Sequence, residues 1–235
     1  MNAHQRIMNI IRISLLGSAL FACQFINGQE LPKDRTELSN LSVRNQDMFL
    51  HDFGPVLKAS GGVGRLYLGS ECVGDSEDLF FPRMELKSED KGKAGIDALR
   101  DVLAKIKDVA VAERRPGIIG ISIGTISNDL LRTKIQVLRL KPLERYNELL
   151  AIKAIFGTRE VETKMREQRM DPAPMVVIHP ILDPDSKLPH LPASMKNLTV
   201  DEALDQVAQT FRGLVIYEEC AGHKRRLFRV HMHEL

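Results

Sequence analysis

A serine between two glycines is the first feature of the chain that could carry out chemistry. Residues 120–124 read Gly-Ile-Ser-Ile-Gly, the G-x-S-x-G pattern of a nucleophile elbow, in which a strained strand-to-helix turn lifts the serine above a sheet. Asp183 and His190, or His223, follow in the chain order that such a triad requires. However, isoleucines flank Ser122 on both sides, which is typical of a strand with the serine at an ordinary position. We therefore assign no catalytic residue and keep Ser122 as an alternative nucleophile.

Histidines close to the C-terminal end are the second chemical candidate. His231 and His233 alternate along a predicted strand and so share one face, while His223 and Cys220 lie across the preceding turn. Two imidazoles with a third ligand nearby could hold zinc. The spacing matches no standard zinc finger, and the same alternation is expected where polar side chains face water and Phe228 faces the core. We therefore assign no metal or other cofactor, and keep His223, His231 and His233 as the alternative ligands of a metal-dependent sensor.

The first thirty residues predict export. Arg6 and Arg12 precede a stretch of thirteen mostly apolar or small residues, 13–25, after which the chain becomes polar. A basic start, a short apolar run and a small residue at the cut define a secretory signal peptide, here residues 1–28, and the run is well under the roughly 20 residues that cross a bilayer. Alternatively, the sequence Leu-Phe-Ala-Cys ending at Cys23 resembles a bacterial lipobox, in which the cysteine is lipidated and anchors the protein.

The cysteines point to one disulfide. Cys23 belongs to the signal or to the lipid site under either cut, and export normally leads to an oxidising compartment where cysteines pair. The other two, Cys72 and Cys220, allow a single intramolecular pairing. They end two similar segments, GRLYLGSEC and GLVIYEEC, each of which follows a predicted helix. We predict a Cys72–Cys220 disulfide, with two buried thiols as the alternative.

The composition is that of an ordinary folded protein and narrows the class of partner. Apolar residues make up 43% and charged residues 27% of the chain, which argues against global disorder. A net charge of +2 and the absence of tryptophan provide neither a strongly basic surface nor many stacking platforms, so we expect no nucleic-acid partner. No later segment is long and apolar enough to span a bilayer, so we expect membrane association only through the possible lipid anchor.

Periodicity predicts an α+β fold of two small modules, built from strand–helix–strand units and joined by charged helices. The first module covers residues 41–141, a helical connector covers 142–173, and a second, βαββ-like module covers 174–235. The clearest element is a helix over 199–211, which a capping box of Thr199 and Glu202 opens. The other predicted helices are 48–59, 93–107, 142–156 and 158–168, and the predicted strands are 65–70, 81–86, 109–112, 118–123, 134–140, 175–178, 214–217 and 227–232.

The second module carries a family resemblance. Residues Leu198–Glu218 read LTVDEALDQVAQTFRGLVIYE, preceded by Asn197, with Glu202-Ala203-Leu204 in the helix and Tyr217 in the following strand. In these positions the segment resembles the short N-terminal domain of bacterial secretins and TonB-dependent receptors. The resemblance covers about forty of the 235 residues. It implies a periplasmic βαββ module that docks other proteins, and it implies no active site.

Together these patterns predict an exported, non-enzymatic binding or scaffolding protein of the bacterial periplasm or cell surface, with protein partners. Depending on the cut, the mature chain is periplasmic, secreted or tethered to the outer surface. A secreted serine hydrolase that uses Ser122 and a metal-dependent sensor that uses the C-terminal histidines are the alternatives. The patterns identify neither the partner nor the oligomeric state.

Overall fold

The computed structural model describes most of the chain after residue 34. The described residues are 35–59, 63–72, 81, 83, 96–103, 109–173, 188–222 and 226–234. The predicted signal peptide 1–28 with Cys23, the predicted strand 175–178, Asp183 and His223 lie outside these residues.

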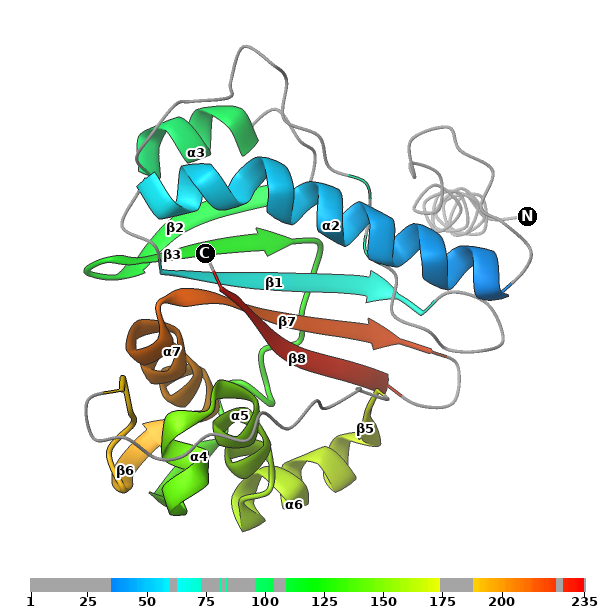
Figure 1. The fold of residues 1–235 in the computed structure, drawn as a ribbon. Helices are drawn as coiled ribbons and strands as arrows, with labels where there is room; N and C mark the ends of the chain where they lie inside the picture. Colours follow the sequence, from blue (N-terminus) through cyan, green and yellow to red (C-terminus); the bar gives the residue numbers. More distant parts are fainter. Residues whose placement is uncertain are drawn as a thin grey trace, which may run out of the picture. The chain divides into compact units, whose positions relative to one another are not determined.

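A six-stranded sheet forms the centre of the fold (Figure 1), with the strand order β2-β3-β1-β7-β8-β5. Its strands are β1 (Gly64–Glu71), β2 (Val109–Arg115), β3 (Ile118–Ile123), β5 (Met170–Pro172), β7 (Gly213–Ala221) and β8 (Arg226–Glu234). The hairpins β2–β3 and β7–β8 are antiparallel, and β1 lies between them, parallel to both β3 and β7. Short β5 runs parallel to the start of β8. A separate antiparallel ribbon pairs β4 (Lys134–Arg139) with β6 (Ser194–Thr199).

Helices cover both faces of the sheet, so its inner strands are apolar on both sides. One face carries α2 (Arg35–Ala59) and α3 (Ile96–Leu103); the other carries α4 (Pro142–Tyr146), α5 (Glu148–Phe156), α6 (Arg159–Gln168) and α7 (Val200–Phe211) (Figure 1). Because strand side chains alternate, Leu66 of β1 joins the core beneath α2 while its neighbour Tyr67 joins the core beneath α7. The α2-side core also contains Phe49, Phe53, Leu57, Leu99, Ile121 and Ile216, and the α7-side core contains Ile152, Ile155, Leu204, Val207, Val215 and Phe228.

The structure confirms the α+β fold and most of the predicted elements. The predicted strands 109–112 and 118–123 form the hairpin β2–β3 around Pro116-Gly117, with Val109 opposite Ile123. Helix α7 starts at the predicted capping box: the backbone N–H of Glu202 donates to Oγ1 of Thr199 (3.1 Å), and the Glu202 carboxylate accepts from the Thr199 N–H (2.8 Å).

Two helices differ from the prediction. Helix α2 begins at Arg35, thirteen residues before the predicted start at residue 48, and it continues through Gly54-Pro55. Its buried face, which includes Phe49 and Phe53, packs on the sheet and outweighs the local breakers. The single helix predicted over 142–156 is split, because Asn147 is extended (φ −134°) and its side chain caps α5 by accepting from the Leu150 N–H at 2.9 Å. No helix in the described residues combines the length and hydropathy needed to cross a bilayer.

Both predicted modules contribute to the same sheet. Strands β1, β2 and β3 come from residues 41–141, whereas β7 and β8 come from residues 174–235. The predicted connector adds β5 and also α5, whose Ile152 and Ile155 are buried in the core, while charged α6 buries only Val161. The boundary at residue 141 therefore divides the sequence but not the sheet.

Candidate functional site: an arginine and carboxylate cluster on helix α7

Ser122 lies inside strand β3. It is paired with Tyr67 of β1 on one side and with Ala110 of β2 on the other. The next described element after β3 is strand β4, so Ser122 is not on a strand-to-helix turn. In the part of the chain that the structure describes, no histidine forms a hydrogen bond with Ser122, and His190 instead contacts the ring of Tyr146. The structure thus agrees with the strand interpretation of this motif and shows no nucleophile elbow.

The two glycines of the motif have packing roles. A β-carbon on Gly120 would lie 2.8 Å from both Cγ and Cδ of Arg114, because the arginine side chain runs across β3 at this point. Gly124 has φ +68° and touches the neighbouring strand end, since a β-carbon there would lie 2.2 Å from the carbonyl oxygen of Gly69. Close approach of neighbouring groups therefore explains both glycines without a catalytic serine.

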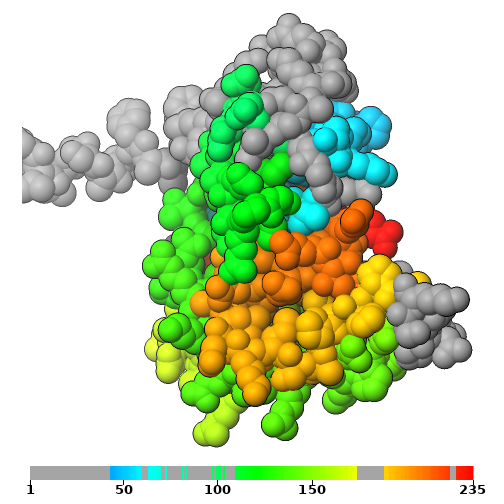
Figure 2. All heavy atoms as spheres, turned by 90° about the vertical axis from the view of Figure 1, so that its left-hand side faces the viewer, coloured from blue at the N-terminus to red at the C-terminus, as the bar shows by residue number. Residues whose placement is uncertain are grey.

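Arg114 belongs to a cluster of charged side chains between the sheet and α7. We define the α7 charge cluster as Arg65 of β1, Arg114 and Arg115 of β2, and Asp201, Glu202 and Asp205 of α7. Figure 2 shows the β2–β3 hairpin and α7 next to each other on one face of the molecule. Arg65 binds Asp205 at 2.9 Å and Asp201 at 3.2 Å. Arg114 also pairs with Asp201, and Arg115 binds Glu202 at 2.7 Å.

Tyr67 sits at the centre of this cluster. Its hydroxyl donates to Oδ1 of Asp201 at 2.9 Å, and the guanidinium carbons of Arg65 and Arg114 lie 5.0 and 4.9 Å from its ring centroid. Burial raises the pKa of Tyr67 well above its ordinary value, so the phenol stays protonated and acts as a donor. Tyr67 therefore packs in the α7-side core with its ring and binds the charge cluster with its hydroxyl.

The cluster includes fully buried charges. Arg65 is 0% and Asp205 is 1% exposed, so both charges have lost their hydration. The attraction between the two side chains offsets this desolvation cost. Burial raises the pKa of Asp205, although Arg65 and Arg114 act in the opposite direction. At the helix end, hydrogen bonds from Thr199 are the main cause of a lowered pKa for Glu202.

The chemistry of the cluster is self-contained. Three arginines face three carboxylates, so the charges cancel and no free general base results. Nε of Arg65 and Oδ2 of Asp205 are buried without a hydrogen bond in the described residues, although Oδ2 lies 3.5 Å from Nε of Arg115. This arrangement fastens the first two turns of α7 to β1 and to the β2–β3 hairpin, which gives it a positioning role.

The C-terminal histidines do not form a metal centre among the described residues. His231 of β8 faces α2 rather than water, which corrects the expectation for this position: the amide of Gln46 donates to its Nε2 at 2.6 Å. Burial, with smaller effects from Arg229 and His233, lowers the pKa of His231 to about 4, so the ring is neutral at pH 7. His233 is exposed, and no group of three His, Cys, Asp or Glu side chains is placed to hold a metal in the described ranges.

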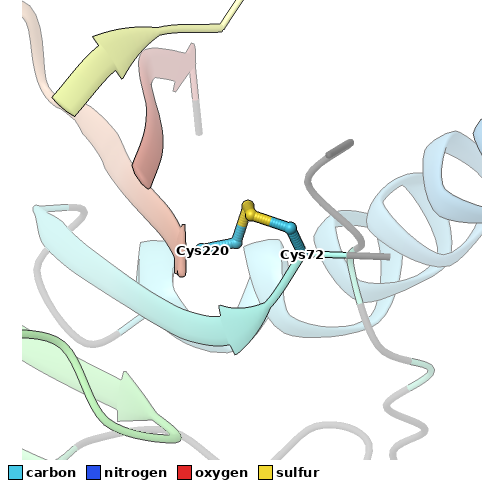
Figure 3. Close-up of a disulfide and its surroundings, with 2 residues drawn as sticks. All are labelled: Cys72 and Cys220. Carbon is cyan, nitrogen blue, oxygen red and sulfur yellow. A yellow bond between two sulfur atoms is a disulfide. The ribbon is translucent and has the colours of Figure 1, made fainter. Parts of the chain in front are cut away.

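The two cysteines meet as predicted. Their sulfur atoms lie 2.04 Å apart, a disulfide distance, with the α-carbons 4.8 Å apart (Figure 3). The parallel pairing of β1 and β7 explains this, because Ser70 lies opposite Cys220 and the N–H of Cys72 donates to the carbonyl of Ala221 at 3.5 Å. Cys220 is buried and Cys72 is half-buried.

Most of the cluster was not recognisable in the sequence. Arg65 stands in an apolar strand, and Arg114-Arg115 reads as part of a turn. The available signal was the pair Asp201 and Asp205, which lie four residues apart on one helix face. Like charges at this spacing repel each other, so the pair predicts basic side chains nearby. Comparisons of the chain with protein-family models, with curated proteins and with solved structures give no match.

Proposed function

We propose that the chain is an exported, non-enzymatic binding or scaffolding protein of the bacterial periplasm or cell surface that docks protein partners. The observation that carries the proposal is the element order β6-α7-β7-β8 over residues 194–234, with the capping box at Thr199 and buried Tyr217 in β7. This is the βαββ order that the resemblance to the short N-terminal domain of secretins and TonB-dependent receptors implies.

The support of α7 is consistent with such a role. A docking surface must keep its shape when the partner binds, because ordering on binding costs affinity. The α7 charge cluster, the capping box and the buried face with Leu204 all fix this helix. A Cys72–Cys220 disulfide, formed after export, would join β7 to β1 as well.

Export is tested by the intact mass of the protein recovered from the exporting cell. The expected mature N-terminus is Gln29, or lipidated Cys23. Fractionation should place the protein in the periplasm, in the medium or at the outer surface. A mature form that still carries Met1 would overturn the export half of the proposal.

Docking is tested by photo-crosslinking in living cells. A photoreactive residue replaces Gln209 or Arg212, both exposed at the end of α7, and Lys58, exposed on α2, is the matched control. The expected result is a discrete adduct with one protein from the α7 positions and none from Lys58. If the α7 positions give no adduct in cells that carry the processed protein, this surface does not dock a partner.

The enzymatic alternative has its own test. A serine-reactive probe should leave Ser122 unlabelled, because the residue is in the middle of a strand and no described histidine activates it. Labelling that is lost in Ser122→Ala but kept in Ser127→Ala would support a hydrolase instead. Metal analysis of the purified protein addresses the sensor alternative with His223, His231 and His233, and we expect no stoichiometric metal.

A further inference from the structure

The β4–β6 ribbon differs from the rest of the chain in its charge. Residues 130–143, LLRTKIQVLRLKPL, contain four basic residues and no acidic one, and residues 188–199, LPHLPASMKNLT, contain Lys196 and no acidic residue. The whole chain has 33 basic and 31 acidic residues, so positive charge is concentrated in these two segments. The structure brings them together, because they form the two strands of the ribbon and the turns beside them.

Part of the ribbon faces outward. Val137 is opposite Lys196 and Arg139 is opposite Ser194, and since these pairs are two residues apart they share one face. All four side chains are exposed, Val137 to 40%. The preceding pair, Ile135 and Leu198, is buried. Between the buried and the exposed pair lies Asn197, whose φ of +53° interrupts the regular alternation of side chains along β6 while the antiparallel register with β4 continues.

No described carboxylate pairs with the cations of this face. We define the ribbon patch as Lys134, Val137, Arg139 and Lys196, all exposed. Among the described residues none of its three cations forms an ion pair, whereas the arginines of the α7 charge cluster are all paired. Among the described acids, Glu160 reaches the ribbon but accepts from the backbone N–H of Gln136 (3.1 Å) and pairs with none of the three cations, and Glu144 pairs with Lys141 (3.8 Å).

We infer that the ribbon patch binds the surface of a bilayer that contains anionic phospholipid. Arginine and lysine side chains pair with lipid phosphates, and each basic group close to such a surface adds to the attraction. The exposed aliphatic side chain of Val137 lies among the cations, and this combination of charge with an apolar contact is typical of interfacial binding. The inference goes beyond the proposed docking function, since lipid binding requires no protein partner and no lipid anchor.

The test is co-sedimentation with lipid vesicles, using the protein as recovered from the exporting cell so that all variants have the same N-terminus. Vesicles contain phosphatidylcholine with about one third phosphatidylglycerol, or phosphatidylcholine alone. Wild type should bind the anionic vesicles at low salt, bind the neutral ones weakly, and lose binding at about 0.5 M salt. The triple variant Lys134→Gln, Arg139→Gln, Lys196→Gln should lower the partition coefficient about 100-fold.

Matched variants separate the patch from net charge. Arg44→Gln, Lys58→Gln, Lys153→Gln removes three exposed cations from other elements and should retain binding to within about threefold. Val137→Ser should weaken binding about fivefold, whereas Val43→Ser, on a valine that is 57% exposed, should not. Equal losses in both triple variants, equal binding to both vesicle types or no binding by wild type would each overturn the inference. A competition experiment provides a further test. Soluble polyaspartate is added at a concentration that does not release a simple cationic peptide from the same vesicles. If this concentration releases the protein, the patch recognises an acidic chain and the inference is overturned.

Discussion

The side chain of Arg114 lies directly against Gly120, and in this way it reaches across β3 to Tyr67 of β1 and Asp201 of α7. A glycine at this place leaves the room that the arginine needs. The pattern that looks catalytic in the sequence is therefore part of the packing between the hairpin and α7.

The first prediction concerns this contact. Gly120→Ala should destabilise the protein by about 1–3 kcal/mol, because a methyl group would lie 2.8 Å from the Arg114 side chain and displace it from the cluster. Denaturant unfolding measures the change. Ser122→Ala, on the same strand and face, should change stability by less than about 0.5 kcal/mol. If the two variants are equally stable, the close contact is wrong.

Removal of the buried carboxylate should have a larger effect. Asp205→Ala leaves buried Arg65 without its main partner, and we expect a loss of about 3–5 kcal/mol in the free energy of unfolding. Asp97→Ala serves as the control, since it removes an acid that is 89% exposed and pairs with Arg100 on α3. This control should cost less than about 1 kcal/mol. Comparable losses in the two variants would show that Arg65 and Asp205 are accessible to water.

The packing of α7 is tested at Leu204, which is fully buried in the α7-side core. Leu204→Ala should destabilise by about 2–5 kcal/mol through lost burial and the cavity that remains. Gln209→Ala, at an exposed position of the same helix, should stay within about 0.5 kcal/mol of wild type. Thermal and denaturant melts measure the stability of both variants. If Leu204→Ala is as stable as Gln209→Ala, the buried face of α7 is wrongly assigned.

For the cysteine pair we expect a disulfide in the exported protein. Non-reducing peptide mapping should give one linked pair containing Cys72 and Cys220. The two cysteines are 148 residues apart, so loss of the cross-link in Cys72→Ser, Cys220→Ser should cost up to about 5 kcal/mol by loop-closure entropy. Two alkylatable thiols in protein isolated from an oxidising compartment would contradict the pairing.

The stability of the protein should also depend on pH through His231. Because its pKa falls from 6.5 to about 4 on folding, the unfolded chain takes up the proton first. The stabilisation is complete above about pH 6.5 and is lost as the pH falls toward 4, by an amount on the order of 3 kcal/mol. Protonation would also remove the acceptor for Gln46. His231→Gln should flatten this pH dependence relative to wild type.

Hydrophobic periodicity, capping residues and turn residues predicted the helices and strands that interactions between residues close in the sequence determine. The capping box and apolar face of α7 suffice to define that helix, and the Pro116-Gly117 turn suffices to define the β2–β3 hairpin. The start of α2 was missed because residues 35–47 contain few apolar residues, so no hydrophobic period indicates a helix there.

The candidate site was the least predictable part. Arg65 and Asp205 are 140 residues apart in the sequence, and only the pairing of distant strands brings them to 2.9 Å. The cysteine pair was predictable only because counting left a single combination, and the similar segments GRLYLGSEC and GLVIYEEC turned out to be neighbouring parallel strands. The partners of Arg65 could not be predicted in this way, because the sequence contains many carboxylates with which it could pair.

The position of β1 between β3 and β7 has a consequence for the order in which the protein can fold. Strand β1 is complete once residue 71 has been synthesised, but its partner β7 begins only at Gly213, and β8, which pairs with β7, follows it. The pairing of β1 with β7 can therefore form only after residue 213 has been synthesised, long after β1 itself. Contacts between such distant segments slow folding, because a long loop must close before they form. Until β7 has been made, the apolar side chains of β1 lack the cover of this neighbouring strand, and an incomplete sheet of this kind is prone to aggregation.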